Sequence, residues 1–333
     1  MKKIVIRTER EINKAVFYDI VYEWENELCK ALKAPMFYAK KYYIGKREIG
    51  ATLLYRLKIN FEDFFLLGKV AFAFEMFGQY SRETIHSSHS AICIIDFYPH
   101  KDLLHAFYNT YRKVPYLCVS SREVYEYLMN HNPERTIYHL PLSIPDKYRI
   151  TKNTRFKKKY DLILVGRQNE RFEKWLAQYC QTHTIRYVYR KYINHETNEF
   201  LYYTNDGEFV CNVITREDYF KILKLCKLAI YTTPGIEGDP KKDVTNGFSQ
   251  VTPRYLELLT CGCMLLGDYP DNPDTKYYEL ERFVSRVTSY KQFEETVNKL
   301  LKQEVNIEEY SNYLEKHYTS IRAKQFEEIL NQK

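Results

Sequence analysis

The 333-residue sequence lacks the features that mark several common protein classes. It has only 11 Gly and 11 Pro and no low-complexity tract, which argues against collagen-like repeats and long disordered segments. No apolar run approaches the roughly 20 residues that span a bilayer, and the charged start MKKIVIRTERE leaves no apolar core for a signal peptide. We therefore expect a cytoplasmic protein, which leaves open a peripheral association with the inner face of the membrane.

Familiar nucleotide and metal motifs are also absent. No G-x-G-x-x-G follows Val5 or Val165, which argues against a nicotinamide cofactor, and no G-x-x-x-x-G-K-[ST] motif occurs, which excludes a P-loop. No Asp-x-Asp ends a strand-like run, and Cys261-x-Cys263 is not a zinc spacing. We expect no metal and no bound cofactor.

The cysteines and the net charge agree with this interpretation. The eight cysteines mostly lie in apolar stretches, as expected of thiols in a reducing compartment. The formal charge is +7, but Lys and Arg are spread along the chain, so we expect no nucleic-acid partner. A surplus of positive charge could favour anionic membrane surfaces or a phosphate-bearing acceptor, and the simpler alternative is a solvated surface with a slight excess of cations.

Strand-like and helix-like patterns alternate along most of the chain. AICIIDF, PYLCVSS and IYHLPL resemble strands separated by helices, and YDLILVGR restarts the pattern after a charged stretch that contains proline. This alternation is typical of parallel sheets built from βαβ units. We expect an α/β fold with Rossmann-like domains at 1–145 and 160–333 and a linker at 146–159. The last helix is a candidate to cross back to the first domain.

Two parts of the pattern are less regular. Residues 36–80 contain apolar stretches whose periodicity does not distinguish a strand from a buried helix. Near the end of the chain, the pattern predicts two helices, at about 289–302 and 306–330.

Polar residues follow the predicted strands of the second domain. In open α/β sheets ligands bind beyond the carboxyl ends of the strands. Gly166 and Arg167, the segment 233–235, the loop 236–252 and the front of the helix predicted at 253–261 occupy such positions. We expect all four to converge on one crevice.

The stretch TPRYLELLTCGC begins the predicted helix 253–261. Thr252 is an N-cap candidate, and Pro253 suits the first helical position. Arg254 in the first turn opposes the helix dipole, so a bound phosphate would explain it. Glu257, one turn further on, suits the hydroxyls of a ribose. The alternative is an Arg254–Glu257 pair at i, i+3 that contributes only about 0.3 kcal/mol.

The segment RYLELLTCGCMLLG resembles the nucleotide-binding helix of GT-B glycosyltransferases. The likeness is to retaining family four and related single-chain transferases of bacterial surface-polysaccharide clusters, whose helix reads approximately P-x-L-E-A-M-A-C-G-x-P-V-V. Glu257 matches the ribose-binding glutamate of that family. VGRQNER resembles the family's V-G-R loop, which implies that Arg167 beside Gly166 contacts the donor diphosphate. The resemblance covers about residues 90–300 and implies two Rossmann-like domains that face each other across a cleft.

The chain departs from the family pattern at two points. The family's Glu-x7-Glu pair would have its first glutamate at Ser249, and two nearby alternatives are Asn246 in Asn-Gly-Phe-Ser and Glu237 in Ile-Glu-Gly. A lysine expected shortly after the phosphate-binding arginine is also absent, and Arg171 or Arg254 could replace it. These alternatives stay open at the level of sequence.

The acceptor side has fewer signals. Asp96 and His100 follow a strand of the first domain, where either could orient or deprotonate an acceptor hydroxyl. The alternative for Asp96, as for Ser121, is to cap the following helix. If the enzyme is retaining, as the resemblance implies, the departing diphosphate can accept the proton itself.

The sequence therefore predicts a glycosyltransferase that uses a nucleotide-diphosphate sugar as substrate. The acceptor would be a hydroxyl of a saccharide or of a lipid-linked molecule, in bacterial surface-polysaccharide or glycolipid synthesis. Positive side chains would balance the leaving group, so we expect a metal-independent reaction. The alternatives are a nucleotide-sugar epimerase of the same fold and a non-catalytic sugar-binding protein.

Overall fold

The structure is a computed structural model that describes residues 3–13, 18–39, 60–80, 86–131, 133–194 and 199–332. The chain divides into two compact units, which are described separately. Unit 1 contains Met1–Asp146 together with Tyr318–Lys333, and unit 2 contains Lys147–His317. The first unit is therefore built from both ends of the chain.

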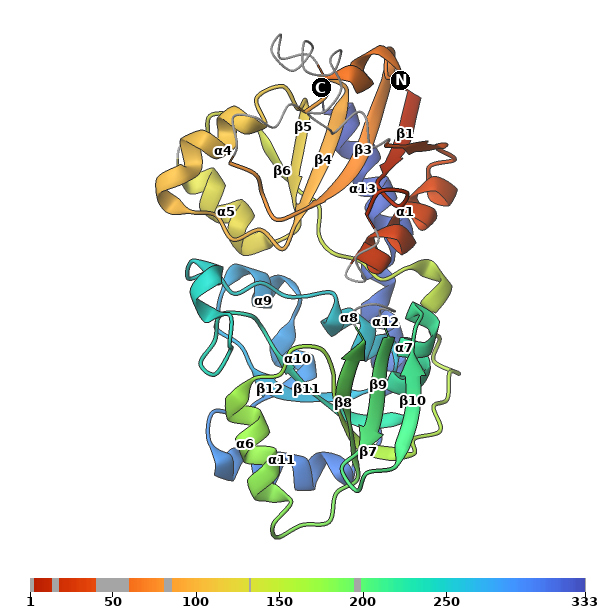
Figure 1. The fold of residues 1–333 in the computed structure, drawn as a ribbon, viewed down its shortest axis with the longest axis vertical. Coiled ribbons are helices and arrows are strands. Elements are labelled where there is room, and N and C mark those ends of the chain that lie inside the picture. Colours follow the sequence, from red (N-terminus) through yellow and green to blue (C-terminus); the bar gives the residue numbers. More distant parts are fainter. Residues whose placement is uncertain are drawn as a thin grey trace. The chain divides into compact units, whose positions relative to one another are not determined.

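Unit 1 contains a six-stranded sheet in the order β2-β1-β3-β4-β5-β6, in which all neighbours are parallel (Figure 1). All six residues of β4 and all four of β5 are buried, as expected of central strands covered on both faces. The strands are β1 (Lys3–Thr8), β2 (Met36–Tyr38), β3 (Lys69–Met76), β4 (Ser90–Ile95), β5 (Tyr116–Val119) and β6 (Ile137–His139).

The helices of unit 1 include one from the end of the chain. They are α1 (Asp19–Ala31), α4 (Leu104–Thr110), α5 (Arg122–Asn130) and α13 (Thr319–Asn331), and α1 and α13 contact each other. The ring of Phe326 in α13 packs edge-on against Phe72 in β3, with 4.6 Å between centroids. Trp24 in α1 is buried and donates from Nε1 to the carbonyl of Ser143 at 3.0 Å. The contacts with α1 and with Phe72 of β3 fix α13 to the first unit.

Unit 2 contains a seven-stranded sheet in the order β10-β9-β8-β7-β11-β12-β13. From β8 to β13 the neighbours are parallel, whereas β9 and β10 add two antiparallel strands at one edge. The strands are β7 (Tyr160–Leu164), β8 (Tyr187–Asn194), β9 (Glu199–Thr204), β10 (Phe209–Val213), β11 (Cys226–Thr232), β12 (Met264–Asp268) and β13 (Val284–Arg286).

The order of these strands creates a switch point. The chain runs from β7 to β8 on one side and then returns to place β11 on the other side of β7. The loops that follow β7 and β11 therefore leave the sheet in opposite directions, which opens a crevice at the carboxyl ends of these two strands.

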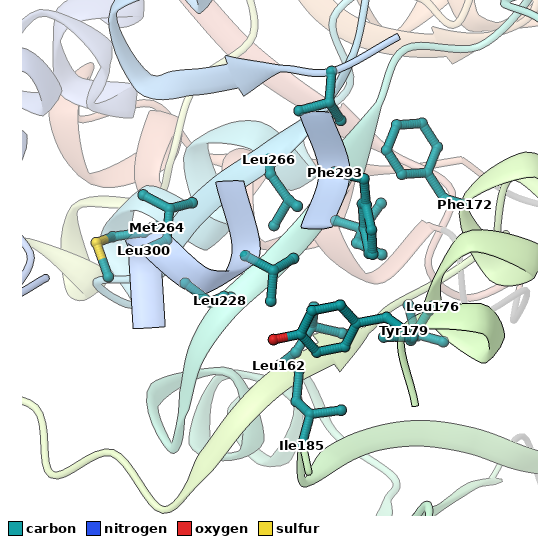
Figure 2. Close-up of a cluster of buried hydrophobic side chains, with 14 residues drawn as sticks. Leu162, Phe172, Leu176, Tyr179, Ile185, Leu228, Met264, Leu266, Phe293 and Leu300 are labelled. Carbon is teal, nitrogen blue, oxygen red and sulfur yellow. The ribbon is translucent and has the colours of Figure 1, made fainter. Parts of the chain in front are cut away.

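Helices cover both faces of this sheet. On one face, α6 (Glu170–Tyr179) and α11 (Tyr290–Leu301) close a core that includes Phe172, Tyr179 and Phe293 (Figure 2). The remaining helices of unit 2 are α7 (Arg216–Lys224), α8 (Arg254–Thr260), α9 (Pro273–Tyr277), α10 (Leu280–Phe283) and α12 (Ile307–Leu314).

The other face of the sheet carries α8. Alternate residues of β11 point to opposite faces, so Leu228 and Ile230 join the core of Figure 2 while Tyr231 lies against Tyr255 of α8, with 5.5 Å between centroids. All residues of α8 from Tyr255 onward are buried. Only its first residue, Arg254, remains partly exposed, and this residue lies beside the switch point.

The prediction of one helix at 306–330 is wrong, because the structure has two helices there. The structure breaks it between α12 and α13, where Tyr318 is fully buried in an extended conformation. Thr319 donates its backbone N–H to the carbonyl of Ile144, so tertiary pairing overrides the helical pattern. Within 36–80, the structure resolves the ambiguous pattern as β2, a 3₁₀ turn at Phe61–Phe64 and β3, and residues 40–59 lie outside the described part.

The first testable prediction concerns Gly267 in β12, which pairs with Tyr231 of β11. A Cβ atom at position 267 would lie 1.7 Å from the carbonyl oxygen of Tyr231, so Gly267→Ala must separate the two strands. We expect it to lower the free energy of unfolding, measured in urea, by about 3 kcal/mol or more. Gly247→Ala is the control, because its Cβ would meet open space and only its φ of +83° is strained; it should cost about 1–2 kcal/mol. Equal losses in the two variants would contradict the prediction.

Candidate functional site

The candidate site lies at the switch point of unit 2. The loop after β7 and the loop after β11 meet the first residue of α8, and together they form a pocket. The pocket is lined by Arg167, Gln168, Asn169, Thr232, Thr233, Pro234, Asp239, Thr252 and Arg254. All four segments that the sequence placed in one crevice thus supply residues to it, and the loop 236–252 contributes Asp239 and Thr252.

Gly166 and Arg254 are in direct contact. Gly166 has a φ of +66°, which an L side chain rarely adopts. A Cβ atom there would lie 2.1 Å from Nη2 of Arg254. The guanidinium of Arg254 therefore packs against the backbone of the β7 loop, and only glycine permits this approach.

Arg254 makes no hydrogen bond or ion pair with any residue that the structure describes. Its side chain is partly buried and lines the pocket. In the first turn of α8 the helix dipole also disfavours a cation, by a few tenths of a kcal/mol. A half-buried guanidinium with unused donors is suited to bind an anion.

Arg167 reaches the same pocket from the β7 loop. Its Nε lies 3.8 Å from Oδ1 of Asp239, and its side chain is 41% exposed. The side chain of Asp239 is only 8% exposed. Its carboxylate accepts hydrogen bonds from the backbone N–H groups of Gly235 at 2.8 Å and Lys241 at 3.0 Å, which stabilise the turn. Arg167 therefore keeps most of its donors for a ligand.

Glu257 does not pair with Arg254, so the i, i+3 pair considered from the sequence is wrong. Its Oε1 accepts a hydrogen bond of 2.6 Å from Nη2 of Arg216, the first residue of α7. The side chain of Glu257 is only 5% exposed. Burial raises the pKa of the nearby Tyr219 phenol well above its usual value, and the charge of Glu257 raises it further.

Arg216 is a site residue that the sequence analysis missed. Its position is set by the capping box at the start of α7, in which Thr215 accepts from the backbone of Asp218 and Asp218 accepts from the backbone of Thr215. The signal was present as Thr-Arg-Glu-Asp. It marks a helix start but does not disclose which side chain the helix presents.

Thr252 does not cap α8, contrary to the prediction. The N-cap residue is Pro253, without a side-chain cap, and the helix runs from Arg254 to Thr260 rather than over 253–261. The backbone N–H of Thr252 donates to the hydroxyl of Tyr231 at 3.1 Å, and its own Oγ1 is buried. Contact with β11 thus takes precedence over capping.

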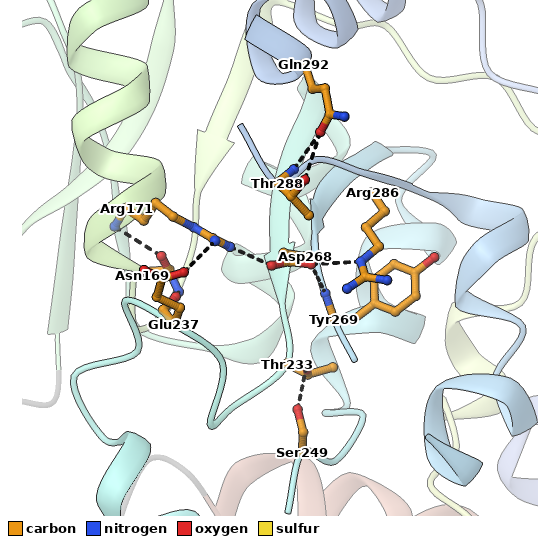
Figure 3. A network of polar contacts seen from close by, with 10 residues as sticks. All are labelled: Asn169, Arg171, Thr233, Glu237, Ser249, Asp268, Tyr269, Arg286, Thr288 and Gln292. Carbon is orange, nitrogen blue, oxygen red and sulfur yellow. Dashed lines mark hydrogen bonds and ion pairs between the residues drawn. The ribbon is translucent and has the colours of Figure 1, made fainter. Parts of the chain in front are cut away.

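Arg171 forms ion pairs within the protein instead of pointing into the pocket (Figure 3). Its guanidinium donates to Asp268 at 2.6 Å and pairs with the exposed Glu237 at 3.2 Å. Asp268 ends β12 and also accepts from Nε of Arg286 at 2.9 Å. Arg171 therefore ties α6 to β12, and neither it nor Glu237 lines the pocket.

Ser249 and Asn246 also lie outside the pocket lining. Ser249 is buried, and its hydroxyl is hydrogen-bonded to the hydroxyl of Thr233 and to the carbonyl of Pro234, each at 2.7 Å (Figure 3). This holds the incoming segment against the loop that follows β11. Asn246 is partly buried and adopts a left-handed conformation with φ of +52°.

In unit 1, Asp96 and His100 follow β4 at the carboxyl edge of the sheet. Asp96 has a positive φ of 49° and is partly buried. It does not cap the next helices, whose N-caps are His100 and Leu103, whereas Ser121 does cap α5 by accepting from Val124. His100 is exposed, and its ring lies edge-on to Tyr80 at 5.5 Å.

His139 is a second residue that the sequence analysis missed. It ends β6, and its Nε2 donates to the carbonyl of Ser120 at 3.2 Å. Burial lowers the pKa of His139 to about 3, and the charges of Arg122 and Arg322 act in the same direction. The imidazole is therefore neutral near pH 7.

No metal site is evident in the part of the chain that the structure describes, where no group of three or more His, Cys, Asp or Glu side chains is arranged to hold an ion. In the same described ranges, no helix has the length and apolarity needed to cross a bilayer. The eight cysteines are free thiols.

The second prediction follows from the environment of His139. Because its pKa falls from 6.5 in the unfolded chain to about 3 in the folded one, the unfolded state binds an extra proton between these values. Stability is present above the unfolded pKa and is lost as the pH falls through this window. Between pH 6.5 and about pH 5, wild type should lose roughly 1–2 kcal/mol more than His139→Gln, measured by urea unfolding. His105→Gln, at an exposed histidine, is the control and should behave as wild type. Equal acid sensitivity of wild type and His139→Gln would refute the prediction.

Comparisons with known proteins bear on the fold. No family model matches the chain, and no curated protein matches it by sequence. Among solved structures, AviGT4, a glycosyltransferase involved in avilamycin A biosynthesis, aligns with a TM-score of 0.56 at 9% identity, covering 100% of this chain and 98% of that one. The UDP-GlcNAc 2-epimerase from Methanocaldococcus jannaschii aligns over 99% of both chains at 10% identity, with a TM-score of 0.49.

A chain of the GtfA/B complex also aligns, at 13% identity and with a TM-score of 0.49, over 81% of this chain. Our chain spans 59% of the length of that protein. At these identities a likeness shows the fold alone, and the alignment with AviGT4 over the whole chain carries that conclusion. The predicted fold class is confirmed: the chain has the GT-B fold, α/β with two Rossmann-like domains.

Proposed function

We propose that the chain is a glycosyltransferase whose unit 2 binds a nucleoside-diphosphate sugar at the switch point. The observation that carries the proposal is the pair of arginines in the pocket. Arg254 makes no hydrogen bond within the described residues, Arg167 has an exposed side chain, and both line the pocket formed with the loops after β7 and β11. Two guanidinium groups match the charge and geometry of a diphosphate.

Glu257 is the second proposed element of donor recognition. It lies one turn beyond Arg254 on α8 and does not itself line the pocket, and we propose that it contacts the nucleoside of a ligand held by Arg254. A carboxylate accepts hydrogen bonds only, which suits the hydroxyls of a ribose. The match of Glu257 to the ribose-binding glutamate of retaining family four supports this assignment.

Arg254, rather than Arg171, is the better replacement for the missing family lysine. Arg171 is engaged by Asp268 and Glu237, whereas Arg254 lines the pocket beside Arg167. When the sugar leaves, these two arginines would stabilise the charge that develops on the diphosphate, without requiring a metal.

The acceptor and the stereochemical outcome belong to the same proposal. Asp96 and His100, at the carboxyl edge of the unit 1 sheet, are the proposed contacts for the acceptor hydroxyl. Retention is the outcome that the family resemblance supports, with the departing diphosphate taking the proton. A saccharide or lipid-linked acceptor, as in surface-polysaccharide or glycolipid synthesis, fits the same resemblance.

The third prediction tests donor binding by isothermal titration with UDP, GDP and ADP. Arg254→Ala, Arg167→Ala and Glu257→Ala should each weaken binding of the preferred nucleotide by about 1.5–3 kcal/mol, because each removes a charged hydrogen bond. Lys276→Ala is the control, since its ammonium pairs with the exposed Asp271. The proposal fails if wild type binds none of the nucleotides, or if all three variants bind as wild type does.

An exposed apolar cluster in unit 1 supports peripheral membrane association. Phe64, Phe65 and Leu67 are 58%, 46% and 70% exposed and lie within four residues of one another. Lys69 follows them, and Lys3 is its partner in the β1–β3 register. Apolar side chains flanked by cations match the interface of a membrane that contains anionic lipid.

The cluster carries little competing negative charge. The acidic residues beside it are engaged inside the protein, since Glu62 pairs with Arg7 at 2.8 Å and Asp63 accepts the backbone N–H of Ser88 at 3.0 Å. The surface presented by Phe64, Phe65 and Leu67 is therefore complementary to a negatively charged bilayer.

The fourth prediction tests this surface. The triple variant Phe64→Ser/Phe65→Ser/Leu67→Ser should partition into phosphatidylglycerol-containing vesicles at least about tenfold less than wild type, measured by co-sedimentation. Phe209→Ser, at a residue of unit 2 that is 53% exposed, is the matched control. Absence of wild-type binding, or undiminished binding of the triple variant, would remove the membrane assignment without touching the donor site.

A further inference from the structure

The Arg216–Glu257 ion pair joins two helices one turn beyond Arg254 of the candidate donor site. Nη2 of Arg216 donates to Oε1 of Glu257 at 2.6 Å, and the two side chains are 18% and 5% exposed. The pair links α7 and α8, which are far apart in the sequence. Such a short, nearly buried contact is a charge-assisted hydrogen bond with a defined geometry.

Arg216 is held rigidly. Its helix begins at a complete capping box, and its guanidinium lies over the rings of Tyr219 and Phe220, with 5.3 Å from the guanidinium carbon to each centroid. Backbone and side chain are thus both fixed before any ligand binds. Glu257 is buried on α8 and has little freedom of its own.

The pair determines what Glu257 can recognise. A carboxylate as buried as this one needs a counter-charge, and Arg216 supplies it. Each carboxylate oxygen accepts two hydrogen bonds. Arg216 occupies one position on Oε1, and Oε2 makes no hydrogen bond with a described residue, so the group retains acceptors for two neighbouring hydroxyls.

We propose that Arg216 is a positioning residue for ribose recognition. It orients Glu257 so that the carboxylate accepts both the 2′- and the 3′-hydroxyl, which makes the donor a ribonucleoside-diphosphate sugar rather than a 2′-deoxyribonucleoside one. This inference rests on the proposed function and names the substrate class of the same site. Arg216 itself does not contact the reacting atoms.

The test compares a ribonucleotide with its 2′-deoxy analogue. Binding of UDP and dUDP, and of GDP and dGDP, is measured by titration calorimetry for wild type, Arg216→Gln, Glu257→Gln and the double variant. Wild type should prefer the ribonucleotide by at least about tenfold, since the analogue lacks one hydrogen bond to a charged acceptor. In Arg216→Gln the ratio of the Kd of the 2′-deoxy analogue to the Kd of the ribonucleotide should approach one. The double variant should show the same ratio as Glu257→Gln alone.

Two further variants separate positioning from general stability. Arg216→Lys keeps the charge but loses the planar fork, so it should restore only part of the ratio. Arg282→Gln removes an exposed arginine that pairs with Glu279 and Glu309, and it should leave the ratio unchanged. Thermal melting of each variant confirms that the measurements are made on folded protein.

The outcomes distinguish the inference from the proposed function. The role of Arg216 would be overturned by a wild-type ratio near one. It would also be overturned if Arg216→Gln weakened both nucleotides equally and so left the ratio unchanged. Neither result would contradict nucleotide binding itself. If wild type bound none of the four nucleotides, the proposed function would fail and the inference with it. The inference is supported if Arg216→Gln loses the preference for the ribonucleotide and the double variant loses no more than Glu257→Gln alone.

Discussion

The contact between Gly166 and the guanidinium of Arg254 is the constraint on which the candidate site depends. It joins the loop after β7 to the start of α8 across the switch point, with a separation that no side chain at position 166 would allow. The glycine adopts a left-handed conformation, so its lack of a Cβ atom serves both the turn and the contact. The backbone of the loop after β7 thus permits the guanidinium to lie against it.

The surrounding polar contacts hold this geometry from outside the pocket. Asp268 at the end of β12 binds Arg171 of α6, and Ser249 binds the loop that follows β11. Each of these side chains makes hydrogen bonds within the protein, whereas Arg254 donates no hydrogen bond to a described residue. The structure therefore separates residues that build the crevice from a residue that remains available inside it.

The sequence was sufficient where a local pattern sets the structure. Alternating strands and helices predicted two Rossmann-like domains, although not β2 and β3, whose pattern was ambiguous. The positions of Gly166 and Arg167 after a strand and of Arg254 at a helix start predicted residues that meet at the switch point. It was insufficient where partners are distant in the sequence. The choice between Arg171 and Arg254 depends on Asp268, which pairs with Arg171 from 97 positions away in the sequence. The role of Arg216 depends on the contact between α7 and α8.

The break between α12 and α13 has the same origin. The stretch predicted as one helix has no proline or glycine to end it, and the helical pattern continues across residues 315–318. Burial of Tyr318 and the backbone bond from Thr319 to Ile144 end the helix instead. Nothing in the local sequence reports that Ile144 is nearby.

The energetics of Arg254 and Glu257 differ in a way that bears on function. Glu257 has its counter-charge in Arg216, so its burial is compensated within the protein. Arg254 is partly buried against Gly166, opposes the dipole of α8 and has no compensating carboxylate among the described residues. A cation kept under these conditions is compensated when an anion binds beside it, and this is the physical basis of the proposed diphosphate site.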